Sequence, residues 1–170
     1  MVRFVFIALL VPALAVFAAP LPAKRAFAFA LQSYDQFQIS DGVAGTAEAQ
    51  ANAPPFPADL TTVDATLLGT LTANLGTMRE AAESAETDDF DPQIAAASGA
   101  DAAALQVGKI KNKVLKLTGE VQQIKIKIAQ ASAAGSSTSD LETSLATEQG
   151  KLTTNIALDV KSKGAASKGR

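Results

Sequence analysis

The chain has 170 residues with no Cys, no His and no Trp, and its 15 basic and 17 acidic residues give a formal net charge of −2. Without His and Cys, the chain lacks the residues of Ser–His and Cys–His catalytic pairs, of His/Cys zinc sites and of Glu-x-x-His di-iron sites. We therefore expect a protein without enzymatic activity, cofactor or metal site. If the protein did catalyse a reaction, carboxylates would have to carry the chemistry.

Residues 1–18 have the pattern of a secretory signal peptide. Arg3 gives a positive start, an uncharged apolar run follows, and Ala18 is the small residue before the predicted cleavage. The alternative is a membrane anchor. However, the apolar stretch 4–20 has 17 residues and is interrupted by Pro12, whereas a spanning helix needs about 20.

A dibasic pair, Lys24-Arg25, follows the predicted cleavage point. Processing proteases of the kexin type cut after such pairs, which predicts a propeptide over 19–25 and a mature chain that begins near Ala26. No later segment is apolar enough to span a membrane. The predicted location is therefore extracellular, with no transmembrane segment in the mature chain.

Residues 26–58 form a poorly periodic N-terminal segment. Ser40 or Asp41 can cap a short Ala-rich helix that runs to about Ala51. The Pro-rich segment after it ends that helix. No convincing strand pattern is present here or elsewhere in the chain.

Residues 59–86 are predicted to form a long helix capped by Asp59. Thr87 to Asp91 is expected to be a turn, and Asp91-Pro92 to start a further helical segment with a break at Ser98-Gly99. The apolar face of the long helix comprises Leu60, Val63, Leu67, Leu71, Leu75, Met78 and Ala82, at steps of three or four.

Residues 100–134 contain the clearest helical signal. Leu115 and Ile126 lie beside its heptad seam, so this helix should be buried on two sides and lie centrally in the fold. The seam comprises Val107, Ile110, Val114, Leu117, Val121, Ile124 and Ile128.

The last helix is predicted over 139–160, opened by a capping box of Ser139 and Glu142. The short loop before it predicts an antiparallel hairpin with the preceding helix. Residues 161–170 are expected to be a flexible basic tail. The fold class is therefore an all-α bundle over 59–160, with three long helices plus one short helix and a C-terminal antiparallel hairpin.

Charge is unevenly distributed along the chain. Residues 26–101 hold one basic and 12 acidic residues, whereas 102–170 hold 11 basic and 5 acidic residues. The basic run could contact an anionic surface, or it could pair with the glutamates that end helix 59–86. The net negative charge of the mature chain argues against nucleic acid as a partner. The candidate contact residues are Lys109, Lys113, Lys116 and Lys127.

Asp88, Asp89 and Asp91 form a dense acidic segment that could bind calcium. A helix-loop-helix calcium site needs Gly at its sixth and Glu at its twelfth position. Counted from Asp88 these positions are Gln93 and Gly99, so the match fails. A capped turn beside the basic helix explains the same residues.

Three stretches of the sequence resemble the small secreted proteins of ascomycete fungi. They are residues 39–45, residues 107–117, and Asn155–Asp159 together with Gly164–Ser167. The resemblance implies a secreted, mostly helical fungal protein of the effector-candidate type without an established activity. It implies no catalytic or binding residues.

The sequence thus predicts a non-enzymatic extracellular interaction protein with an unidentified partner, such as a host or cell-wall component. One alternative is a bundle that carries a small apolar ligand or lipid between its helices, which a cavity there would favour. A carboxylate-based hydrolase is a further alternative, which convergent acids in a cleft would favour.

Overall fold

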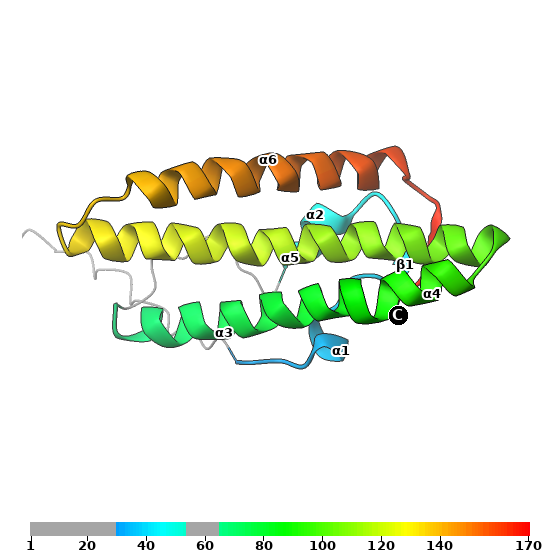
Figure 1. Cartoon of the computed structure of the whole chain (residues 1–170), viewed down its shortest axis with the longest axis horizontal. Helices are drawn as coiled ribbons and strands as arrows, with labels where there is room; N and C mark the ends of the chain where they lie inside the picture. The colour runs from blue at the N-terminus through cyan, green and yellow to red at the C-terminus, as the bar shows by residue number, and fades with distance from the viewer. Residues whose placement is uncertain (1–29, 54–64) are drawn as a thin grey trace, which may run out of the picture.

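The computed structural model describes residues 30–53 and 65–170. Within these ranges the fold is the predicted all-α bundle (Figure 1). The predicted signal peptide and propeptide, with Ala18, Lys24 and Arg25, lie outside the described residues. So does the predicted cap Asp59.

The central element is α5, with α6 along one side and α3 along the other (Figure 1). The helices α5 and α6 form the predicted antiparallel hairpin. In chain order the elements are α1 (Tyr34–Phe37), β1 (Gly42–Val43), α2 (Ala47–Ala51), α3 (Ala65–Ser84), the π-helical turn η1 (Ala85–Phe90), α4 (Asp91–Ala96), α5 (Gly99–Ala133), α6 (Ser139–Lys161) and β2 (Ala166–Ser167).

The heptad seam of α5 is buried where it was predicted to be. Val114, Leu117, Val121 and Ile124 are all buried, while the seam positions nearer the ends of the helix are partly buried. Leu115, on the flank of the seam, is fully buried. A helix with apolar residues on a face and its flank must be covered by more than one neighbour, which explains its position between α3 and α6.

The main hydrophobic core lies between α3 and α5 and is closed by α1 and α2. Tyr34 and Phe37 of α1 meet edge to face, with ring centroids 5.5 Å apart. Leu67 differs from the prediction, because it is exposed rather than part of the buried stripe. The stripe residues of α3 that are buried are Leu71, Leu75, Met78 and Ala82.

The prediction of a turn at Thr87 to Asp91 is wrong. The chain continues through η1 as a π-helix, in which the N–H of Asp91 donates to the carbonyl of Glu86, five residues back. Such widened turns are rare and insert an extra residue into a helix. Phe90 at the end of the turn is fully buried, so packing supports this local geometry. The chain reverses later, between α4 and α5, at the break expected near Ser98.

The prediction of a capping box at Ser139 is also wrong. Thr138 takes the N-cap position of α6, and its hydroxyl donates to the Glu142 carboxylate at 2.7 Å. The sequence placed the start of the helix correctly to within one residue. The prediction paired Glu142 with Ser139 rather than with Thr138, because Ser and Thr can both serve as the N-cap of a helix.

The last residues form a docked segment rather than the expected free tail. β2 pairs antiparallel with β1, which gives a small two-stranded sheet where no strand was predicted. The Arg170 guanidinium lies 4.6 Å from the Tyr34 ring centroid. A Cβ on Gly108 would lie 2.0 Å from the carbonyl oxygen of Lys168, so only glycine allows this close approach to α5.

Candidate functional site

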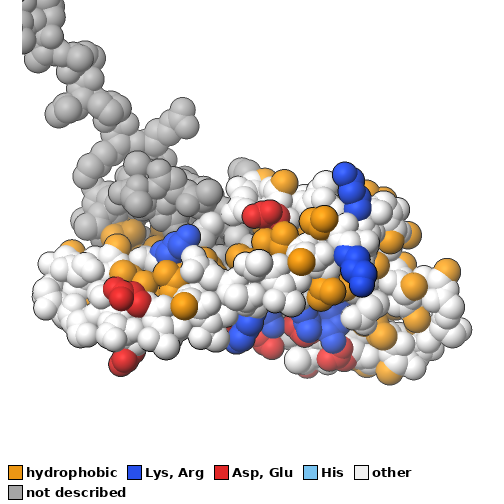
Figure 2. Space-filling model, turned by 90° about the horizontal axis from the view of Figure 1, so that it is seen from above, with side chains coloured by type: hydrophobic (Ala, Val, Ile, Leu, Met, Phe, Trp, Pro, Cys, Tyr) orange, Lys and Arg blue, Asp and Glu red, His pale blue; other side chains and the backbone are white. Residues whose placement is uncertain are grey.

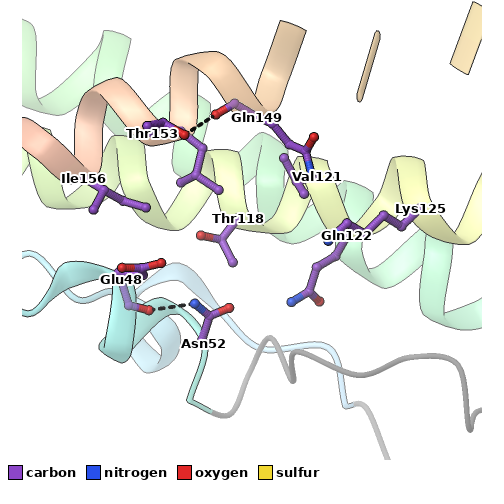
Figure 3. A pocket seen from close by; sticks show the side chains of 10 residues that line it. Glu48, Asn52, Thr118, Val121, Gln122, Lys125, Gln149, Thr153 and Ile156 are labelled. Atoms are coloured by element: carbon purple, nitrogen blue, oxygen red, sulfur yellow. Dashed lines mark hydrogen bonds between the residues drawn. The ribbon is translucent and has the colours of Figure 1, made fainter. Parts of the chain in front are cut away.

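A pocket of about 420 Å³ lies between α2, α5 and α6 (Figure 3). This volume falls within the range of about 300–1,000 Å³ that is typical of small-molecule sites. The floor of the pocket is on α5, where Thr118, Val121 and Gln122 are buried. The remaining lining residues are Glu48 and Asn52 from the α2 side, Gln149, Leu152, Thr153 and Ile156 from α6, and Lys125 from α5.

The α2 wall of the pocket is held in place by α6. A five-residue helix is not stable by itself, and Asp159 compensates for this. Its carboxylate accepts the backbone N–H groups of Gly45 and Ala47, each at 2.9 Å, and the side chain is buried. Asp159 therefore caps the start of α2 from a distant part of the chain.

Lys111 holds the loop before α2 from the opposite side. It is fully buried, and its ammonium donates to the carbonyl oxygens of Asp41 at 2.7 Å and Val43 at 3.3 Å. Burial lowers the pKa of Lys111, while the charges of Asp159 and Asp41 oppose that shift. The loop is thus fixed between α5 and α6.

Several polar groups of the pocket already use their donors inside the protein. The Thr118 hydroxyl donates to the Val114 carbonyl at 2.8 Å, and the Thr153 hydroxyl donates to the Gln149 carbonyl at 2.9 Å. The side-chain N–H of Asn52 donates to the Glu48 carbonyl at 3.0 Å (Figure 3). The oxygen atoms of these side chains keep lone pairs that can accept further hydrogen bonds.

The composition of the pocket limits its chemistry. Among the lining residues that the structure describes, Glu48 is the one carboxylate, whereas hydrolysis of a glycosidic bond uses two. In residues 30–53 and 65–170, no three carboxylates gather closely enough to hold a metal ion. Seven of the ten described residues that line the pocket are polar, so the pocket suits binding of a small polar molecule.

The lysines predicted to contact an anionic surface mostly have partners within the protein. Three of them, Lys109, Lys113 and Lys116, converge on Glu86 at the junction of α3, η1 and α5. Lys116 pairs with Glu86 at 2.8 Å and with Glu83 at 2.9 Å, and Lys109 also pairs with Asp91. We call Lys109, Lys113, Lys116, Glu83, Glu86 and Asp91 the ionic cluster.

The pKa values of the ionic cluster reflect this pairing. Burial alone would raise the pKa of Glu86, but hydrogen bonds from Lys116 and Lys113 outweigh it and the pKa is lowered. Burial alone would lower the pKa of Lys116, but its bonds to Glu86 and Glu83 raise it. Both pKa shifts favour the charged forms of the two side chains. The ion pairs of the cluster therefore stay charged and hold α5 to the end of α3.

Lys127 lies apart from the ionic cluster and is exposed on α5. On the face of the molecule in Figure 2, charged side chains are sparse, and basic and acidic side chains lie next to one another along one edge. This face therefore carries no continuous basic patch. The arrangement matches the interpretation of the basic run as the partner of the glutamates.

The residues that build the pocket were not among those predicted from the sequence. Thr118 and Gln122 occupy polar positions of α5 beside the seam, and Gln149 and Thr153 have the pattern of a solvent-facing side of α6. No local signal distinguishes a polar residue that lines a pocket from one that faces open solvent. Only the approach of α2 brings these side chains together.

Comparisons with known proteins assign the chain to a family. A model described as a domain of unknown function, DUF8454, matches residues 29–170, so the chain belongs to the DUF8454 family. No curated protein matches the chain, and no solved structure matches it. Of the helices in the described ranges, none is both long and apolar enough to cross a membrane.

Proposed function

We propose that this member of the DUF8454 family is a secreted, non-enzymatic binding protein of the fungal type, and that the pocket between α2, α5 and α6 is its binding site. The pocket carries the proposal, because it combines a buried floor with polar groups on three sides. The protein would act outside the cell on a component of its surroundings, such as one from a host or a cell wall.

The leader supports the extracellular location. The pattern of residues 1–18 and the pair Lys24-Arg25 are those of a secreted, processed chain. The family match begins at residue 29, so the segments that we assign to the leader precede the domain. The absence of Cys is unusual for a small secreted protein, because such proteins often depend on disulfides. We propose that the buried seam of α5 stabilises the fold in their place.

Carriage of an apolar ligand is the alternative that a cavity between helices would favour. Within the described part of the chain, the aliphatic lining consists of Val121, Leu152 and Ile156, and the other lining side chains are polar or charged. An apolar ligand would displace water from the charges of Glu48 and Lys125 and offer them no hydrogen bond, which costs free energy. The lining therefore favours a polar ligand.

A binding screen with matched variants tests the proposal. The secreted protein, labelled with ¹⁵N, is titrated with an amino acid, a neutral sugar and a fatty acid while backbone amide shifts are recorded. Thr153→Leu fills the pocket, whereas Thr154→Leu is its control, because both hydroxyls are exposed and donate to the carbonyl four residues back.

We expect a polar probe to shift amides of α2, α5 and α6, and we expect Thr153→Leu but not Thr154→Leu to abolish the shifts. A response to the fatty acid alone would favour the apolar carrier. If no probe gives shifts that depend on Thr153, the pocket is not a small-molecule site and the proposal is wrong.

A further inference from the structure

The two charged residues of the pocket lie at opposite ends of it. Figure 3 shows Glu48 beside Asn52 and Thr118 at one end, and Lys125 at the other. Neither Glu48 nor Lys125 forms an ion pair with any other residue in the part of the chain that the structure describes. Both charges are therefore available to a ligand.

The end of the pocket near Glu48 is rich in acceptors. The Thr118 hydroxyl and the Asn52 amide each commit a hydrogen atom to a backbone carbonyl, which leaves their oxygen atoms as acceptors beside the Glu48 carboxylate. A group that carries several N–H donors and a positive charge matches this end best. An ammonium group has both properties.

The opposite end and the floor have different chemistry. Lys125 offers an ammonium that can donate to an anion such as a carboxylate. Between the two ends, Val121, Leu152 and Ile156 form an aliphatic surface, against which a small apolar side chain can be buried.

Both charges of a free amino acid sit on one carbon, too close together to reach both ends of the pocket. We propose that the pocket binds a small zwitterion, namely a short peptide with aliphatic side chains. Its ammonium group lies toward Glu48 and its carboxylate toward Lys125. This inference rests on the proposed function, because it names the class of ligand for the same site.

The test compares ligands that differ by one charge. Leucyl-leucine is the zwitterionic probe, N-acetyl-leucyl-leucine lacks the ammonium and leucyl-leucinamide lacks the carboxylate. L-Leucine carries both charges too close together to reach both ends. We expect leucyl-leucine to bind at least about tenfold more tightly than either single-charge analogue or L-leucine, because hydrogen bonds to charged groups are the stronger ones. Glucose serves as the neutral polar probe.

Matched variants assign each charge. Glu48→Gln should weaken binding of leucyl-leucine by roughly tenfold and leave N-acetyl-leucyl-leucine unaffected, while Lys125→Gln should spare leucyl-leucinamide. Asp140→Asn and Lys127→Gln, both at exposed positions, remove the same charges away from the pocket and should change nothing. Thermal melting of each variant confirms that it is folded.

Two results would overturn the inference in different ways. If glucose produces shifts that depend on Thr153 and the charge variants do not alter binding, the ligand is a neutral polar molecule, and the proposed function stands without the zwitterion. If none of the probes, including the fatty acid, gives shifts that depend on Thr153, both proposals fail.

Discussion

Asp159 near the end of α6 accepts the backbone N–H of Ala47, the first residue of α2, at 2.9 Å across 112 positions of the sequence. The same carboxylate accepts the N–H of Gly45, and its charge faces the buried Lys111. One side chain therefore fixes the α2 wall of the pocket and balances a buried cation.

Replacing Asp159 with Ala should destabilise the protein by about 3 kcal/mol or more, because it removes the carboxylate that has the larger of the two charge effects on the buried Lys111 and also removes the cap of α2. Urea unfolding measures the loss. The control is Asp140→Asn, at an exposed position in the first turn of α6, which should cost less than about 1 kcal/mol. Equal unfolding midpoints for the two variants would contradict the role of Asp159.

Leu117→Asp should unfold the protein, because it places an unpaired charge in a position that is 5% exposed. The milder Leu117→Ala should cost about 2–5 kcal/mol. Leu158, which is 42% exposed, is the matched control, and Leu158→Ala should have a much smaller effect. Lys109 would be a poor control, because its side chain is 16% exposed and paired with acids. Similar melting temperatures for the two alanine variants would refute the assignment of the buried face.

Acidification should destabilise the protein partly through Glu86. Its folded pKa is lowered from the ordinary value of 4.5, so the folded state binds fewer protons than the unfolded state. The stability that Glu86 contributes is present above pH 4.5 and is lost as the pH falls through the folded pKa. Thermal melts between pH 7 and about 2 should therefore show a shallower decline for Glu86→Gln than for the wild type. Glu80→Gln, at a side chain 73% exposed, should keep the wild-type profile.

The protein should show weak or no retention on heparin or anionic liposomes at physiological salt, because Lys109, Lys113 and Lys116 are engaged in the ionic cluster. Lys127→Glu should leave the elution position nearly unchanged. Strong retention that disappears when the three paired lysines are reversed to Glu, with the fold intact, would make the basic run a binding surface after all.

Processing of the leader gives a prediction that depends on sequence alone. Mass spectrometry of the protein secreted from a fungal host should find an N-terminus at or near Ala26, after Lys24-Arg25. Lys24→Ala together with Arg25→Ala should shift the start to Ala19. Detection of Ala19 as the sole start in the unaltered protein would show that no propeptide is removed after Lys24-Arg25.

Features encoded by local periodicity were predicted correctly. The seam from Val107 to Ile128 identified α5 and its central position, and the Gly- and Ser-rich loop after it identified the hairpin with α6. These predictions succeed because an amphipathic helix repeats its apolar residues every three or four positions whatever it packs against. The pairing of the basic run with Glu83 and Glu86 was one of the two alternatives that the sequence predicted, because the two segments are close in sequence.

The pocket, the π-helical turn and the docked end of the chain depend on contacts between distant residues. Lys111, Asn112 and Asp159 are polar types that usually lie at the surface, and they are buried here because the loop before α2, Tyr34 and the Ala82 carbonyl supply their hydrogen bonds. The sequence by itself therefore determined which segments are helices and which face of α5 is buried. The tertiary structure alone decided which polar groups are enclosed, because a polar side chain becomes part of a core or of a pocket only when distant backbone and side-chain partners compensate for its lost hydration.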